Sequence, residues 1–238
     1  MLLYKQLKYN ISLNKKYICA QNIQCNLKYK EVKMKKIIKK SKWIILFVCL
    51  IFFLALAKDV FNKEIMQGDI IGYKIISTYL ISDFATPIAK FITNFGGATI
   101  LISLTILFFI FIKNKKISLT IFTNLIIITG LNMILKNILQ RPRPEEFRII
   151  NESGYSFPSG HSMVSMAFYG YLMYLIYKYI KNKYLKYSLI ILLGILICLI
   201  GISRIYLGVH YTSDVLAGFL ISIPYLIVYI SIAKKYVL

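Results

Sequence analysis

Acidic residues, histidines and cysteines are all scarce in this sequence, and each scarcity excludes a kind of site. The chain holds 9 acidic residues against 30 Lys and Arg, and it has only two histidines. Its cysteines, Cys19, Cys25, Cys49 and Cys198, do not have zinc-site spacing, and none lies in a loop expected outside the cell. With no cluster of carboxylates or thiols, we expect no metal, no other cofactor and no disulfide.

Polar stretches long enough for a soluble domain are also missing. Hydrophobic residues make up 58% of the chain, and several uninterrupted runs approach the roughly 20 residues that cross a bilayer. The sequence therefore predicts an all-α integral membrane protein, a six-transmembrane-helix bundle. The expected spans are Trp43–Ala57, Phe91–Ile112, Ile117–Leu135, Ser162–Ile180, Tyr187–Ile202 and Val215–Ala233.

Residues 1–42 are Lys-rich and lack apolar periodicity, which predicts a basic cytoplasmic tail ahead of a membrane domain at residues 43–238. The Lys28–Lys42 part is either a topology signal or a contact for anionic lipid headgroups. Met34-Lys35-Lys36 is typical of a bacterial start, so translation from Met34 is an alternative beginning.

The net charge of +21 is spread in small clusters between apolar runs rather than gathered in one domain. No compact basic domain could bind nucleic acid, and we expect no nucleic-acid partner. Lysine-rich segments alternate with acidic ones, which indicates that both termini are cytoplasmic. The loops expected outside are Lys58–Lys90, Lys136–His161 and Ser203–Asp214, which hold every acidic residue except Glu31.

An amphipathic helix is expected after the first span. Apolar residues recur there at helical spacing behind Asp69, a candidate N-cap: Ile70, Ile71, Ile75, Ile76, Tyr79 and Leu80. This pattern predicts a helix lying in the membrane interface, as a hydrophobic brace or as a wall of a substrate groove.

The last two outer loops contain both histidines. In the first loop, Pro142 and Pro144 forbid continued helix and hold Arg143 on an extended turn. Later in the same loop, Pro158-Ser159-Gly160 predicts a tight turn at a helix start, where Ser159 caps the helix and Gly160 permits close backbone approach. Backbone N–H groups at such a start suit an anion.

The second loop places a cation, an imidazole and a carboxylate between two apolar spans. If a helix begins near His210, then His210 and Asp214 lie one turn apart on one face. A carboxylate there could fix the imidazole tautomer and stabilise its cationic form.

Together the two loops supply the groups that a phosphate dianion needs. Arginine offers a planar fork and lysine a point charge to phosphate oxygens, and two histidines allow attack on phosphorus and protonation of the leaving group. Taken singly, Lys136 and Arg204 could be residues that only snorkel to the interface. The candidate site is Lys136, Arg143, Ser159, Gly160, His161, Arg204, His210 and Asp214. The other charges of the first loop, Arg141, Arg148, Glu145, Glu146 and Glu152, are interpreted as solvated.

The full pattern is Lys136, six residues, Arg143-Pro144, then Pro158–His161, then Ser203-Arg204, five residues, His210, three residues and Asp214. It resembles the tripartite signature of the type 2 phosphatidic acid phosphatase superfamily, and is most similar to bacterial members of the phosphatidylglycerophosphatase B and undecaprenyl pyrophosphate phosphatase kind. The resemblance covers Lys58 to the C-terminus. It departs at Thr212, where those members often carry proline.

The resemblance implies the roles. His210 is then the nucleophile that forms a phosphohistidine, Asp214 orients it, and His161 is the general acid. The phosphate-binding residues are Lys136, Arg143, Ser159, Gly160 and Arg204. The family needs no metal.

We therefore expect a phosphatase in the bacterial cell membrane that hydrolyses lipid phosphate or diphosphate monoesters at the outer face. Expected substrates are undecaprenyl pyrophosphate, phosphatidylglycerol phosphate or phosphatidic acid. Alternatives are a lipid phosphotransferase with the same histidine chemistry, a haloperoxidase, which the apolar spans disfavour, and a non-enzymatic lipid binder or transporter. The oligomeric state is left open.

Overall fold

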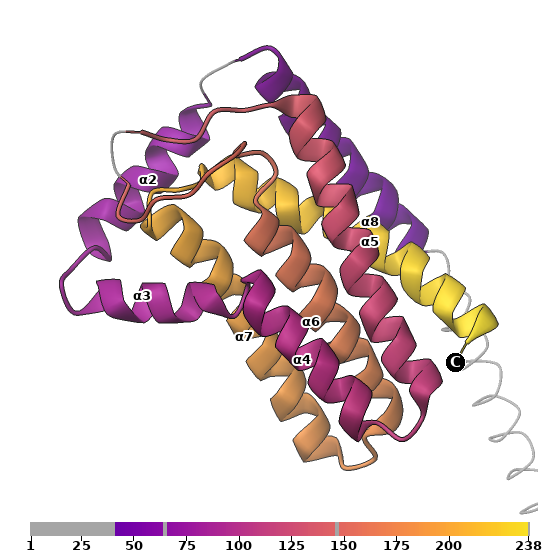
Figure 1. Cartoon of the computed structure of the whole chain (residues 1–238). Coiled ribbons are helices and arrows are strands. Elements are labelled where there is room, and N and C mark those ends of the chain that lie inside the picture. The colour runs from indigo at the N-terminus through magenta and orange to yellow at the C-terminus, as the bar shows by residue number, and fades with distance from the viewer. Residues whose placement is uncertain (1–40, 64–65, 146–147, 238) are drawn as a thin grey trace, which may run out of the picture. The chain divides into compact units, whose positions relative to one another are not determined.

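A computed structural model describes residues 41–63, 66–145 and 148–237. The secondary structure of these residues is entirely helical. The chain divides into two units, Met1–Ile45 and Leu46–Leu238. The first helix is Ser41–Phe61. The following helices are α2 (Gln67–Tyr79), α3 (Ala85–Asn94), α4 (Ala98–Phe111), α5 (Lys115–Leu139), α6 (Gly160–Tyr179), α7 (Lys183–Tyr206) and α8 (Thr212–Tyr236) (Figure 1).

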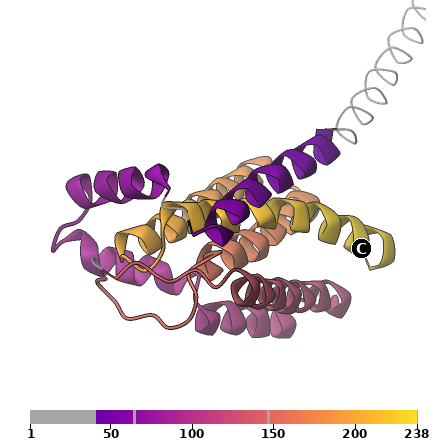
Figure 2. The same ribbon diagram turned by 90° about the horizontal axis from the view of Figure 1, so that it is seen from above.

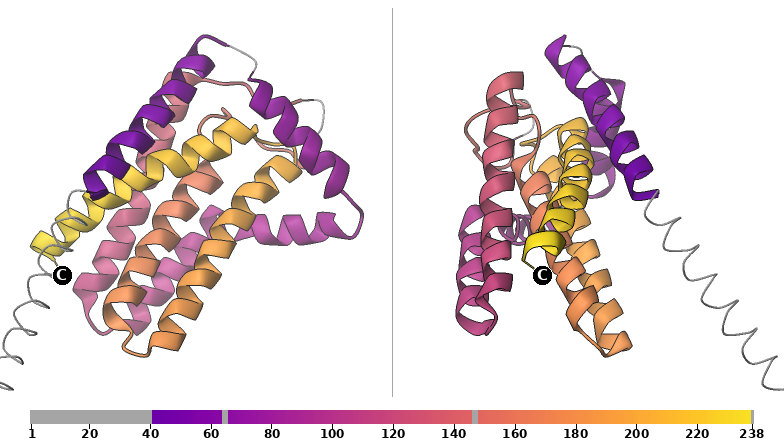
Figure 3. Two further views of the ribbon diagram at one scale, coloured as in Figure 1. Left: turned by 180° about the vertical axis from the view of Figure 1, so that it is seen from behind. Right: turned by 90° about the vertical axis from the view of Figure 1, so that its right-hand side faces the viewer.

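Helix α6 is the centre of the second unit. It lies between α5 and α7 (Figure 1), and α8 crosses it on the far side (Figure 3, left). Its side chains Met163, Ala167, Phe168 and Tyr171 are almost fully buried against these neighbours. Because most of α6 faces other helices rather than lipid, it can carry serines and tyrosines that would be costly on a lipid-facing surface.

Among the residues that the structure describes, four helices are long and apolar enough to cross a membrane: Ser41–Phe61, α5, α7 and α8. A fifth candidate is the pair α3 and α4, bent by 47° at a short break. Helix α6 is not among the candidates, and its polar residues explain why. The presence of six spans therefore stays a prediction, whereas the all-helical architecture agrees with the expectation from the sequence.

The sequence predicted one continuous span over Phe91–Ile112, and this prediction is wrong. The chain breaks at Phe95–Gly97, between α3 and α4. A Cβ atom on Gly96 would lie 2.7 Å from Ile200 Cγ2 and 3.1 Å from His161 Cδ2. The break therefore lets the backbone approach α6 and α7 more closely than a side chain at Gly96 would allow.

Helix α2 also differs from the expectation in one respect. Its N-cap is Met66, so Asp69 lies inside the first turn instead of capping the helix. Asp69 and Ile76 are buried, whereas Ile70, Ile71 and Ile75 are exposed. Seen from above, α2 lies beside the start of α8 (Figure 2). An interfacial position for α2 stays a prediction.

The loops that follow α5 and α7 meet at one end of the bundle. Helix α5 ends at Leu139, Gln140 has a left-handed backbone (φ 44°), and the prolines that follow prevent further helix. The backbone N–H of Ile149 donates to the carbonyl of Leu207 at 3.0 Å and joins the two loops. This junction brings together segments more than fifty residues apart in the chain.

Candidate active site

The turn before α6 is joined directly to the start of α8. The N–H of Ser159 donates to the carbonyl of Asp214 at 3.0 Å. Ser159 caps α6, accepting from the N–H of Ser162 at 3.5 Å. His161 in the first turn of α6 is thereby held on the same side of the bundle as His210, which precedes α8.

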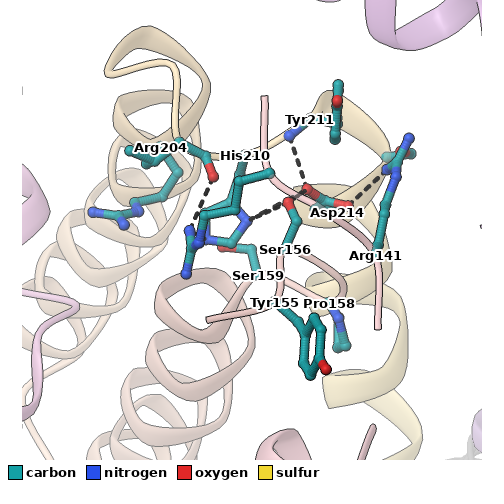
Figure 4. Close-up of polar contacts among 12 residues, drawn as sticks. Arg141, Tyr155, Ser156, Pro158, Ser159, Arg204, His210, Tyr211 and Asp214 are labelled. Atoms are coloured by element: carbon teal, nitrogen blue, oxygen red, sulfur yellow. Dashed lines mark hydrogen bonds and ion pairs between the residues drawn. The ribbon is translucent and has the colours of Figure 1, made fainter. Parts of the chain in front are cut away.

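His210 lies between the carboxylate of Asp214 (Figure 4) and the guanidinium of Arg143. Its Nδ1 lies 3.4 Å from Asp214 Oδ2 and 3.3 Å from Ser156 Oγ, and its Nε2 lies 3.1 Å from Arg143 Nη1. A proton on Nδ1 would face the carboxylate, which leaves the Nε2 lone pair toward Arg143. Since α8 begins at Thr212, the pair meets across the loop–helix junction rather than along a helix face as expected.

Burial lowers the pKa of His210 to about 4, against the opposing effect of Asp214. Arg204 and Arg143 lower it further, because their positive charges disfavour a second cation nearby. The imidazole is therefore neutral at pH 7, as a nitrogen nucleophile must be.

The carboxylate of Asp214 is fully buried and saturated with donors (Figure 4). Its Oδ2 accepts from the hydroxyl of Ser156 and, at 2.8 Å, from the N–H of Tyr211. Its Oδ1 lies 2.7 Å from Arg141 Nη1. These contacts leave the carboxylate one orientation, with Oδ2 toward His210.

Arg143 is held in place by backbone carbonyls. Its Nε donates to Gly154 O at 2.9 Å, its Nη2 to Ser153 O at 3.0 Å, and its Nη1 to Val209 O at 2.9 Å. The first two carbonyls lie in the loop before α6 and the third lies beside His210. The three carbonyls therefore hold the guanidinium next to the imidazole, and Glu152 Oε2 lies 4.0 Å from its Nη2.

Arg204, near the end of α7, is only 1% exposed. Its Nη1 donates to Thr93 Oγ1 at 2.8 Å, and its Nη2 lies 2.7 Å from Glu152 Oε1. Its buried Nε has no hydrogen-bond partner within the part of the chain that the structure describes. An unpaired buried donor on a cation is a feature that an oxyanion would satisfy.

Lys136 reaches the same region from the last turn of α5. Its Nζ donates to the carbonyls of Tyr155 and Ser156. Gly160 allows α5 and the start of α6 to pack closely, because a Cβ atom at Gly160 would lie 3.0 Å from Asn132 Oδ1 on α5.

Burial, together with the nearby charges of Arg204, His210, Arg143 and Lys136, lowers the pKa of His161 to about 2. The structure thus brings the sequence-predicted residues from three separate segments into one cluster at the loop end of the bundle. Their individual roles stay predictions.

The interpretation of Arg141 and Glu152 as solvated loop charges is wrong. The Arg141 side chain is 10% exposed and pairs with both Asp69 and Asp214. Glu152 is partly buried and pairs with Arg204. The sequence offered one signal for Arg141, a second arginine within Arg141-Pro142-Arg143-Pro144, and none that distinguished Glu152 from Glu145.

A family model described as the PAP2 superfamily matches residues 116–237. Phosphatidylglycerophosphatase B of Bacillus subtilis is 43% identical over 93 residues, which are 37% of this chain and 44% of that protein. The aligned part is thus less than half of that relative's length.

Two further likenesses cover more of the chain. Undecaprenyl-diphosphatase of Sulfolobus acidocaldarius is 28% identical over 170 residues, 68% of this chain and 73% of that protein. The crystal structure of a transmembrane PAP2 type phosphatidylglycerolphosphate phosphatase from Bacillus subtilis superposes with a TM-score of 0.70 at 27% identity. That superposition covers 80% of this chain and 96% of the other.

Proposed function

The chain belongs to the PAP2 superfamily, and we propose that it is a membrane phosphatase that removes phosphate from lipid phosphate or diphosphate monoesters. The observation that carries this proposal is the placement of His210 between Asp214 and Arg143, and the buried, unpaired Nε of Arg204 supports it. A phosphoryl group would supply oxygen acceptors to these donors and negative charge to the cations.

His210 is the proposed nucleophile. Its Nε2 attacks phosphorus, an N–P bond forms, and the bond between phosphorus and the leaving oxygen breaks. The Nδ1 proton stays on the imidazole and faces Asp214 Oδ2, so the carboxylate balances the positive charge that develops on the ring. Arg143 Nη1, 3.1 Å from Nε2, is placed to hold an oxygen of the transferring group.

His161 completes both halves of the reaction. His161 must first take up a proton, which the negative charge of a bound phosphate favours by opposing the effect of the nearby cations. In the first half it donates this proton to the leaving oxygen, which departs as the lipid alcohol or lipid monophosphate. In the second half it accepts a proton from water as that water attacks phosphorus. The N–P bond then breaks, inorganic phosphate leaves, and His210 is regenerated.

The positive charge that stabilises the transition state comes from arginine and lysine side chains in this scheme. Within the described residues, no group of three or more His, Cys, Asp or Glu is arranged to hold a metal ion. We propose that turnover proceeds without a metal, in keeping with the cations gathered around the two histidines.

The proposed substrates are undecaprenyl pyrophosphate, phosphatidylglycerol phosphate and phosphatidic acid. Two observations support lipid rather than soluble phosphate esters: the site lies at the ends of apolar helices, and the relatives named above are phosphatases of membrane lipids. A tail that remains in the bilayer would present its headgroup to this end of the bundle.

Phosphate release from these three lipids in detergent, with chelator present, tests the proposal. We expect release from at least one lipid by the wild type and a loss of about 10⁴-fold or more in His210→Ala. A radiolabelled headgroup phosphate should be trapped on the wild type in samples quenched with alkali, in which a phosphohistidine is stable, and not on the variant. Undiminished release by His210→Ala would refute the nucleophile, and a requirement for a divalent metal would refute the metal-free scheme.

A further inference from the structure

The guanidinium of Arg141 lies between two buried carboxylates. Its Nη2 is 2.6 Å from Asp69 Oδ2 and its Nη1 is 2.7 Å from Asp214 Oδ1, and the two carboxylate side chains are 4% and 0% exposed. The ring of Tyr211 covers one face, with its centroid 4.0 Å from Arg141 Cζ. Arg141 thus binds the carboxylate that faces His210, but through the oxygen that His210 does not use.

Asp69 also binds the start of α8 directly, through Ser213. Its Oδ1 accepts from the N–H of Ser213 at 2.7 Å, and its Oδ2 accepts from the hydroxyl of Ser213 at 2.9 Å. Ser213 precedes Asp214 directly in the chain. Asp69 therefore fixes both the backbone beside Asp214 and the cation that holds its side chain.

The face of α2 that carries Asp69 is shaped to fit α8. One turn after Asp69, a Cβ atom on Gly72 would lie 2.2 Å from Thr212 Oγ1, so the α2 backbone packs directly against the Thr212 side chain. One turn further, Ile76 is buried in a cluster that includes Val215. Helix α2 lies before residues 116–237, the part that the family model matches.

We propose that Arg141 and Asp69 are positioning residues that hold the Asp214 carboxylate ionised and aligned on His210, with α2 supplying Asp69. This inference rests on the proposed roles of His210 and Asp214. Without Arg141, two buried carboxylates would share a site with no cation between them, and one of them would take up a proton. An uncharged or rotated Asp214 would no longer stabilise the charge that develops on His210.

The test compares Arg141→Gln, Arg141→Lys, Asp69→Asn and the double variant Asp69→Asn/Arg141→Gln. Asp83→Asn, which neutralises an exposed acid in the loop after α2, is the matched control. We expect Arg141→Gln to lower kcat by about 100-fold with KM unchanged, because the residue touches Asp214 and not the phosphate. Arg141→Lys should recover part of this loss, since it restores a cation.

Asp69→Asn should lower kcat by about tenfold, again without a change in KM. The double variant should be no worse than Arg141→Gln alone, because both changes act through Asp214. Asp83→Asn should behave as the wild type. Losses that simply multiply in the double variant would overturn the shared action on Asp214.

Thermal unfolding in detergent separates positioning from folding. If Arg141→Gln does not fold, Arg141→Lys and Asp69→Asn test the proposal instead. The kcat of each is compared with that of the wild type at the same folded fraction. Folded variants with wild-type kcat, or with a raised KM at unchanged kcat, would overturn the proposal. His210→Ala is assayed alongside: activity in that variant would refute the proposed function, whereas an inactive His210→Ala beside a fully active Arg141→Gln would refute only the positioning role.

Discussion

Glu152 Oε1 lies 2.7 Å from Arg204 Nη2, so a carboxylate from the loop before α6 occupies one arm of a buried arginine that is also a proposed phosphate ligand. The other oxygen, Oε2, lies 4.0 Å from Arg143 Nη2. Arg204 is almost fully buried, whereas the Glu152 side chain is 29% exposed. A phosphoryl group approaching Arg204 would meet this carboxylate.

The first prediction concerns Glu152→Gln. Removing the negative charge of Glu152 makes the potential at Arg204 and Arg143 more positive. Inorganic phosphate should therefore inhibit the variant at a concentration about threefold to tenfold lower than it inhibits the wild type. Product inhibition is measured with a fixed lipid phosphate, and Glu145→Gln, an exposed acid of the same loop, is the control. Weaker inhibition in Glu152→Gln would mean that the carboxylate organises the arginines instead of competing with phosphate.

The second prediction concerns the break between α3 and α4. Gly96→Ala adds a methyl group that would meet Ile200 at 2.7 Å and the His161 ring at 3.1 Å. The displaced imidazole should lower kcat by about 10-fold to 100-fold. Gly194→Ala is the matched control, because a Cβ atom at Gly194 meets nothing within 4 Å. Full activity in Gly96→Ala would show that the position of His161 tolerates a shift.

The third prediction concerns pH. The pKa of His210 is lowered by burial to about 4 in the folded protein, against about 6.5 in an unfolded chain. Between these values the unfolded state binds more protons, so stability falls as the pH falls from about 6.5 to about 4. The thermal midpoint of the wild type should fall further than that of His210→Asn between pH 7 and pH 4.5. An equal decrease of the thermal midpoint in the wild type and in His210→Asn would show that His210 takes up a proton as readily in the folded as in the unfolded protein.

The fourth prediction concerns orientation in the membrane. Ser153, in the loop before α6, and Lys181, between α6 and α7, are both exposed. In a chain whose four native cysteines are replaced by serine, Ser153→Cys should react with a membrane-impermeant maleimide on intact cells. Lys181→Cys should react only after permeabilisation. The reverse pattern would place the proposed site in the cytoplasm.

Much of the architecture could be predicted because it depends on local properties of the chain. Long apolar runs indicated the helices α5, α7 and α8, and prolines and the Ser159 turn indicated where the loops begin and end. Arg204, His210 and Asp214 were singled out because charges beside apolar runs are costly. Gly96-Gly97 was a signal for a break that the prediction of one span passed over. The sequence could not indicate that α6 and α7 pack closely against that break.

By itself, then, the sequence determined that this is an all-helical protein with histidines and cations at the ends of apolar segments. Only the tertiary structure decided which charges are partners. Arg141 with Asp69, and Arg204 with Glu152, are separated in the chain by dozens of residues, so no periodicity or spacing connects them. Their pairing follows from the packing of α2 and α7 against the two loops, where burial removes water and leaves each charge to be neutralised by its nearest opposite.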